Sequence, residues 1–294
     1  IKKPEAGEGA AQEISSKDYV EVSSIGMNFE MIDEISSGWT SFRYSNKSKE
    51  THFFILEKLP KGIGIDQYRK EFLGPFRKAY EFFLKGEIET GNKQFEDLPS
   101  WSSNMEICGG VALTSPGKVS ETTLYLEPGT YIMECYVRMP SGLPHIFCGM
   151  MKEFSVTRKK NMIKEPSADR EIIISSHQGI TFLDSLAEGR YRFSVEFKDQ
   201  KIYEHMLGHD INLVKIDSIN QIETLSDWLD LSDYSSFRTP APEGLTFLGG
   251  VEDLFVTKRG YFDVSLTEGH YVLISEIPNA KQRNMFKRFE VVSD

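Results

Sequence analysis

The second half of this chain repeats segments of the first half, and no other feature limits the possible folds as strongly. Five segments return in the same order, each at a position typical of a turn or a strand. The clearest pairs are Gly109-Gly-Val with Gly249-Gly-Val, and Leu126-Glu-Pro-Gly-Thr-Tyr131 with Leu266-Thr-Glu-Gly-His-Tyr271. The sequence therefore predicts two copies of one domain. We expect a flexible leader at residues 1–17, a first domain at 18–157, a polar linker at 158–170 and a second domain at 171–294.

Short runs rich in Val, Ile, Phe, Tyr and Thr recur along nearly the whole chain, separated by Gly, Pro, Ser and Asn. This pattern favours an all-β protein with mostly antiparallel strands. The length of 294 residues suits two domains that can each bury a core.

Each copy also contains an insertion with helical spacing. In the first, Asp66 is expected to cap a helix that carries an aromatic stripe and is broken or kinked at Gly74-Pro75. In the second, Asp217 or Ser218 precedes an apolar face. The stripes can line a cleft or a partner surface, although packing against the sheets is the simpler expectation. Their members are Tyr68, Phe72, Phe76, Tyr80 and Phe83 in the first copy, and Ile219, Ile222, Leu225 and Leu229 in the second.

Charge and motifs exclude several functions. Charged residues make up 27% of the chain and the net charge is −10, which disfavours nucleic acid or an anionic membrane face as a partner. No apolar run is long enough to span a membrane. The sequence has no Gly-x-Ser-x-Gly elbow, no phosphate-binding glycine loop and no His-x-His pair. We therefore do not expect an enzyme.

The first stretch, IKKPEAGEGAAQEISSKD, is charged, small and rich in Gly and Ala. It is typical of a flexible leader that remains after a signal segment has gone. We expect an exported protein in the periplasm or on the outer surface of a bacterium, with lipid anchoring as an option. Three cysteines do not make a disulfide framework. Cys108 and Cys148 can form one bridge or remain two buried thiols.

One loop carries three side chains that suit a soft metal ion. In CYVRMPSGLPHIFCGM, Cys135, His145 and Met150 follow a strand-like run. A thiolate, an imidazole and a thioether select copper, with the thioether as a weak axial ligand. Such a site needs a second imidazole, and His52 at the start of another strand-like segment is the candidate.

The alternation of side chains along that strand places Cys135. Period two puts Tyr131, Met133 and Cys135 on one face, and Glu134 with Tyr136 on the other. Because Glu134 suggests a partly wet face, Cys135 is expected to point inward at the end of the strand. A buried thiol without a metal ion would have the same pattern.

These residues resemble the cupredoxins, the plastocyanin and azurin family. His52 follows an Asn-containing turn that begins at Asn46, and a Pro-Gly turn precedes the strand that leads to Cys135. The resemblance covers residues 20 to 157, and the Cys-to-His spacing is longer than in small members. It implies Greek-key β-sandwich domains and one type 1 (blue) copper ion for electron transfer or copper carriage. The implied ligands are His52, Cys135, His145 and Met150, with Met151 as a weaker substitute for the axial group.

The second copy lacks part of this set. Ser275 stands at the place of Cys135 and Ala280 at the place of His145, while His209 and Met285 remain. Copper is therefore expected in the first domain only. Because Met285 persists where no metal can bind, Met150 can in part be a core residue that the fold requires, and His209 raises the same alternative for His52.

The alternative is a metal-free β-sandwich module that binds partners or serves a structural role at the cell surface. A redox protein or a surface protein is the partner that these two readings imply. The sequence leaves the oligomeric state open.

Overall fold

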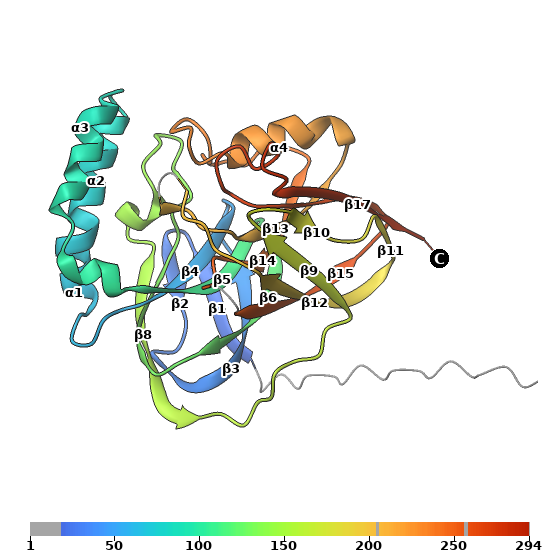
Figure 1. Ribbon diagram of the computed structural model, residues 1–294, viewed down its shortest axis with the longest axis horizontal. Helices are drawn as coiled ribbons and strands as arrows, with labels where there is room; N and C mark the ends of the chain where they lie inside the picture. Colours follow the sequence, from blue (N-terminus) through green and yellow to red (C-terminus); the bar gives the residue numbers. More distant parts are fainter. Residues whose placement is uncertain (1–18, 204–205, 256–257, 294) are drawn as a thin grey trace, which may run out of the picture.

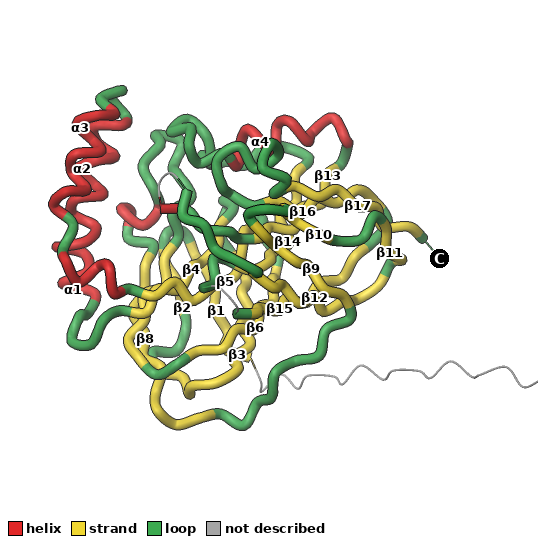
Figure 2. Tube along the Cα trace, in the orientation of Figure 1, coloured by secondary structure: helices red, strands yellow, loops and turns green. Residues whose placement is uncertain are grey.

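The computed structural model describes residues 19–203, 206–255 and 258–293, and the chain there is mainly β-structure (Figures 1 and 2). The predicted all-β class with helical insertions is confirmed. The leader predicted at residues 1–17 lies outside the described residues. We refer below to residues 19–160 as the first half and to residues 170–293 as the second half.

The first half holds strands β1 to β8, which end at Lys160. The strands are β1 (Tyr19–Ile25), β2 (Asn28–Glu30), β3 (Glu34–Asn46), β4 (His52–Lys58), β5 (Glu106–Thr114), β6 (Val119–Leu126), β7 (Gly129–Glu134) and β8 (Met151–Lys160).

The second half begins with β9 and continues to β17. Its strands are β9 (Arg170–Ser175), β10 (Gly179–Thr181), β11 (Ser185–Ala187), β12 (Gly189–Phe197), β13 (Ile211–Ile216), β14 (Leu245–Val251), β15 (Arg259–Leu266), β16 (Gly269–Ile274) and β17 (Phe286–Val292).

Strand pairing continues from one half into the other. One run of neighbours is β2-β1-β3-β6-β15-β12-β9-β10, in which β6 and β15 join the halves. A second run is β8-β7-β4-β5-β14-β13-β16-β17-β11, in which the pair Thr114–Leu248 joins β5 to β14. One hydrophobic core includes side chains of both halves. The two halves are thus connected by backbone hydrogen bonds as well as by apolar packing.

The echoed sequence segments hold matching positions in the strand register. In both halves a central strand, β4 or β13, lies between two antiparallel neighbours. The residues that face this central strand in one half are the repeat equivalents of those that face it in the other half. The same holds for the pairs β3–β6 and β12–β15. The matching pairs are Ile55–Gly110 with Asn212–Gly250, Ile55–Glu134 with Asn212–Ile274, and Gly38–Leu126 with Gly189–Leu266.

The first helical insertion lies beside the sheet of the first half (Figure 1). It comprises α1 (Ile65–Gln67), a π-helical turn at Tyr68–Phe72, α2 (Leu73–Phe83) and α3 (Ile88–Lys93). The prediction that Asp66 caps this helix is wrong, because Asp66 lies inside α1 and Gly64 is the N-cap. The Glu153 carboxylate instead accepts a hydrogen bond from the Ile65 backbone N–H at 2.6 Å. The π-helical turn ends at Phe72, two residues before Gly74, and α2 runs on through Gly74-Pro75, where proline removes a backbone donor.

This insertion covers the face on which Glu134 lies. The Tyr68 hydroxyl donates to Glu57 Oε2 at 2.6 Å or to Glu134 Oε2 at 2.7 Å, and all three side chains are buried. The prediction of a partly wet face is wrong, since Glu134 is only 7% exposed. The aromatic stripe packs on the sheet at Tyr68, as expected.

The second insertion contains α4 (Ile222–Leu229) after a short 3-10 turn. Of the two predicted caps, Ser218 is the one observed. Its hydroxyl accepts from the Asn220 backbone N–H, and the Gln221 side chain accepts from the Ser218 backbone N–H. These reciprocal bonds satisfy amide groups that have no partner inside the helix. Leu225 and Leu229 on the apolar face are buried.

Candidate metal centre

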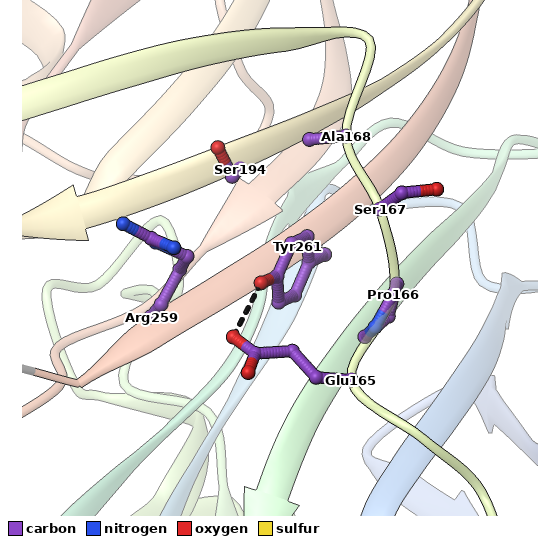
Figure 3. Close-up of a pocket in the computed structure, with 7 residues that line it drawn as sticks. All are labelled: Glu165, Pro166, Ser167, Ala168, Ser194, Arg259 and Tyr261. Carbon is purple, nitrogen blue, oxygen red and sulfur yellow. Dashed lines mark hydrogen bonds between the residues drawn. The ribbon is translucent and has the colours of Figure 1, made fainter.

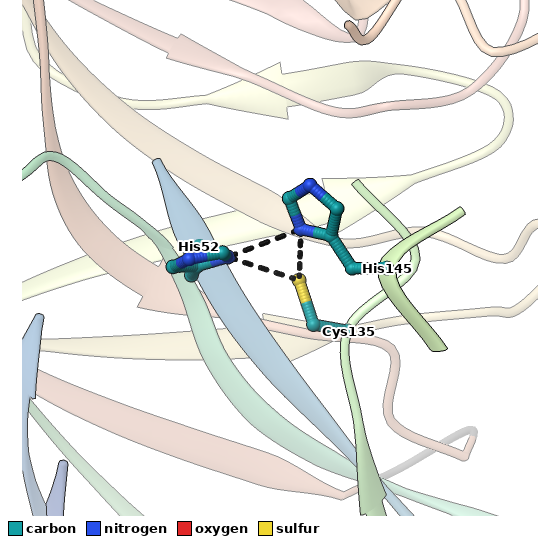
Figure 4. A group of neighbouring side chains, drawn as sticks. All are labelled: His52, Cys135 and His145. Carbon is teal, nitrogen blue, oxygen red and sulfur yellow. Dashed lines mark hydrogen bonds between the residues drawn. The ribbon is translucent and has the colours of Figure 1, made fainter. Parts of the chain in front are cut away.

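Three of the four predicted ligands meet at one edge of the first-half sheet. His52 is the first residue of β4, and Cys135 follows the last residue of β7. Because β4 and β7 are antiparallel neighbours, the start of one lies beside the end of the other. His145 begins a 3-10 turn, His145–Cys148, on the loop that leaves β7. Figure 4 shows the two rings and the sulfur pointing toward one another.

The ligand atoms form a compact triangle. The Nδ1 atoms of His52 and His145 are 3.1 Å apart, and each lies 3.8 Å from Cys135 Sγ. All three residues are fully buried. Atoms that share one ion at roughly 2.0 to 2.3 Å stand roughly 3 to 4.5 Å from one another. The separations therefore fit a single metal ion bound by two imidazoles and one thiolate.

Met150 lies close to these residues through its backbone. Its N–H donates to the His145 carbonyl at 3.2 Å, and its carbonyl accepts from the Cys135 N–H at 3.3 Å. Met150 is fully buried in the same core cluster as Cys135. Met151 belongs to the cluster under the helical insertion, and its Sδ accepts a hydrogen bond from Arg69 at 3.1 Å. Met150 is thus better placed than Met151 to provide a thioether.

Burial sets the protonation states of the three donors. It lowers the pKa of His52 to about 4 and, together with the nearby His52, that of His145 to about 3. Both imidazoles are therefore neutral near pH 7, the form that binds metal ions. Burial raises the pKa of the Cys135 thiol, so binding of a cation must release its proton.

A hydrogen-bonded turn positions His52. The Asn46 side-chain amide donates to the Glu50 carbonyl at 2.8 Å and to the Thr114 carbonyl at 2.7 Å. Thr114 is the residue that faces His52 across β4 and β5. Asn46 therefore connects the turn before β4 with the end of β5, and this holds His52 in place.

The second half fixes the loop that carries His145. Arg138 is fully buried, and its guanidinium donates to the carbonyls of Leu231, Asp233 and Ser236 at 2.6 to 3.2 Å. The Arg138 backbone also exchanges hydrogen bonds with Phe237 and Thr239. These contacts restrain the long spacer between Cys135 and His145, which was the main departure from the family pattern.

Glu50 faces the outer nitrogen of His145, a contact that the sequence did not indicate. Its Oε2 lies 3.4 Å from His145 Nε2, and both atoms are buried without a hydrogen bond. The Nε2 atom of His52 also lacks a partner. A carboxylate beside an imidazole N–H makes that imidazole a stronger ligand.

The second half has the same backbone contacts without the ligands. Met285 donates to the Ala280 carbonyl at 2.8 Å and accepts from the Ser275 N–H at 3.1 Å, as Met150 does with His145 and Cys135. His209 is bonded through both ring nitrogens, to the Tyr203 hydroxyl and the Asp199 carbonyl, each at 3.1 Å. No thiolate lies beside it in the described part of the second half.

Cys108 and Cys148 are free, and they do not form the bridge that the sequence left open. Cys108 is buried but Cys148 is exposed, so the alternative of two buried thiols is wrong for Cys148. Cys148 ends a short 3-10 turn directly before Gly149, whose left-handed conformation, with a φ of 102°, terminates that turn. Among the described residues, no helix is long and apolar enough to cross a membrane.

A surface pocket lies away from this centre, between residues 165–168 and strands β12 and β15 (Figure 3). The Tyr261 hydroxyl donates to Glu165 Oε1 there at 2.6 Å. Arg259 and Ser194 also line the pocket, which contains none of the predicted ligands.

No protein-family model and no curated protein sequence matches this chain. Among solved structures, it is similar to dithionite-reduced auracyanin from Roseiflexus castenholzii, at 18% identity and a TM-score of 0.29 over 48% of this chain and 97% of the other. Auracyanin A, a "blue" copper protein from Chloroflexus aurantiacus, is 20% identical, with a TM-score of 0.28 over 47% of this chain and 98% of its own. A multicopper oxidase is 11% identical, with a TM-score of 0.24 over 93% of this chain and 87% of its own.

Proposed function

We propose that this chain is a cupredoxin-like protein in which His52, Cys135 and His145 would bind one copper ion, and Met150 would supply a thioether. Its function is electron transfer or copper carriage, without catalysis. The triangle of two imidazole nitrogens and one sulfur, with sides of 3.1, 3.8 and 3.8 Å, carries this proposal.

The donor set favours copper. A thiolate with two imidazoles in a trigonal arrangement and a weak thioether is the set that copper electron carriers use. When bound there, the ion would supply a one-electron redox couple. The chain's residues would bind the ion and exclude water by complete burial, while Asn46 fixes the turn before His52 and the Glu50 carboxylate lies beside His145 Nε2. A site closed to solvent suits electron passage, which needs no access for a substrate.

We further propose that the two halves are copies of one domain and that the second copy has lost its copper site. The matching register of β4 with β13 supports this, as do the shared backbone contacts of Met150 and Met285. Export to the periplasm or outer surface of a bacterium is part of the proposal. It rests on the composition of residues 1–17.

Addition of Cu(II) to the purified protein tests the copper proposal. We expect an intense visible absorption band from thiolate-to-copper charge transfer at one copper per chain. Cys135→Ser should abolish the band because it removes the thiolate. Cys108→Ser is the matched control, since Cys108 is also buried but lies outside the triangle. A colourless wild-type protein that takes up no copper would favour the metal-free binding module instead.

A further inference from the structure

Three buried carboxylates gather where the second half meets the first. Asp210, Glu252 and Glu276 are almost completely buried, and one oxygen of each lies within 4.8 Å of the others. Asp210 directly precedes β13, Glu252 directly follows β14, and Glu276 lies two residues beyond β16. Because β13 is the antiparallel neighbour of both other strands, these positions share one edge of the sheet.

Two of the carboxylates are held by hydrogen bonds. Asp210 accepts from the Ser275 hydroxyl, from the Glu276 backbone N–H at 2.8 Å and from the Asn212 amide at 2.7 Å. Glu276 accepts from the Tyr136 hydroxyl at 3.1 Å and from the Asn212 amide at 3.4 Å. The two side chains are therefore fixed in orientation.

Glu252 is different, because neither of its carboxylate oxygens has a hydrogen-bond partner although the side chain is fully buried. No ion pair to Asp210, Glu252 or Glu276 occurs within the described ranges. Burying a carboxylate without a partner costs several kcal/mol, so the group must be neutralised. Burial raises the pKa of all three carboxyls, which expresses the same cost.

We propose that Asp210, Glu252 and Glu276 are the protein ligands of a divalent cation that prefers oxygen, of the class of Ca²⁺, Mg²⁺ and Mn²⁺. Carboxylate oxygens are the donors that these ions select. A proton cannot replace the ion equally well. A proton on Glu252 would have no acceptor within hydrogen-bond distance, whereas a cation would be met by an oxygen of each carboxylate.

The site lies at the junction of the two halves. From the first half, the Tyr136 hydroxyl donates to Glu276, and the Leu113 backbone N–H donates to the side-chain Oδ1 of Asn212 at 2.9 Å. In the strand register of the first half, Phe53 and Tyr136 occupy the positions equivalent to Asp210 and Glu276. The centroids of these two rings lie 4.5 Å apart. The cation therefore binds where the second half has carboxylates in place of aromatic rings, and it stabilises the contact between halves.

Mn²⁺ is a suitable probe because its EPR signal distinguishes free from bound ion. Titration of the EDTA-treated full chain should show one bound Mn²⁺ that raises the melting temperature. Glu252→Gln should weaken binding at least about 100-fold, more than the loss of an outer-shell partner does. Glu57→Gln is the matched control, a buried carboxylate outside the cluster, and should bind as wild type does. Competition by Ca²⁺ and Mg²⁺ then identifies the preferred ion.

The same variants separate this site from the copper centre. Cys135→Ser should lose the visible copper band and keep Mn²⁺ binding, whereas Glu252→Gln should keep the band. If folded wild-type protein binds none of the three ions at millimolar concentration, the carboxyls hold protons and the proposal is overturned. Equal Mn²⁺ affinity of wild type and Glu252→Gln would overturn it as well.

Discussion

Burial keeps the imidazoles of His52 and His145 in the neutral form that binds metal ions, whereas it keeps the Cys135 thiol protonated. The same three residues on a wet surface would hold a protonated imidazole at mildly acid pH and would bind ions of many kinds. Here burial lowers the pKa values of the two imidazoles to about 4 and about 3, and it keeps them neutral. Copper uptake should therefore be limited by loss of the Cys135 proton.

Replacement of Met150 tests whether its thioether contributes to copper binding. Met150→Leu should keep the visible band and raise the reduction potential by on the order of tens of mV, because a weak donor to the oxidised ion is lost. Voltammetry of the copper-loaded protein measures the change. Met285→Leu is the matched control, because Met285 is equally buried and makes the same backbone contacts. Equal potentials in Met150→Leu and wild type would make Met150 a core residue only.

The sequence predicted that His52, Cys135 and His145 would lie together, because two of them share one loop and the third opens a strand. Asp210, Glu252 and Glu276 escaped prediction since they are far apart in the sequence and meet only when β13, β14 and β16 pair. Glu50 gave no signal, because its role depends on the position of the His145 ring.

The first helical insertion converts an exposed sheet face into a buried one. Without it, Glu57 and Glu134 would face water. Beneath the π-helical turn they share the Tyr68 hydroxyl, and burial raises the pKa of Glu57 to about 7. Sequence alternation placed Glu134 on the correct face, but it could not show that a helix from elsewhere covers that face.

This pair should make stability depend on pH. Because the folded-state pKa of Glu57 is above its ordinary value of 4.5, its contribution is fully present below about pH 4.5 and is lost as pH rises through about 7. Glu57→Gln cannot ionise. Its free energy of unfolding should fall less between pH 5 and pH 8 than that of wild type, by about 1 to 3 kcal/mol.

Urea unfolding at the two pH values measures this difference. Glu127→Gln, which removes an exposed carboxylate bound to Lys58, should leave the pH dependence as in wild type. The same pH dependence in Glu57→Gln and wild type would mean that Glu57 is ionised in the folded protein.

The two halves are linked by strand pairing, by the Arg138 contacts and by a shared core, so we expect them to unfold together. Calorimetry of the full chain should give one cooperative transition, with a calorimetric enthalpy equal to the van't Hoff enthalpy. Two separated transitions would show that the halves are independent despite these contacts.

The repeats and strand runs predicted the class of the fold, whereas β6–β15 and β5–β14 pairing joins distant segments that no local pattern connects.

X-ray absorption at the copper edge of the copper-loaded protein tests the central claim most directly. Bonding of one ion by His52, Cys135 and His145 predicts one short copper–sulfur distance and two imidazole nitrogens, with the sulfur signal absent in Cys135→Ser. A spectrum with only oxygen and nitrogen neighbours in the wild-type protein would contradict it.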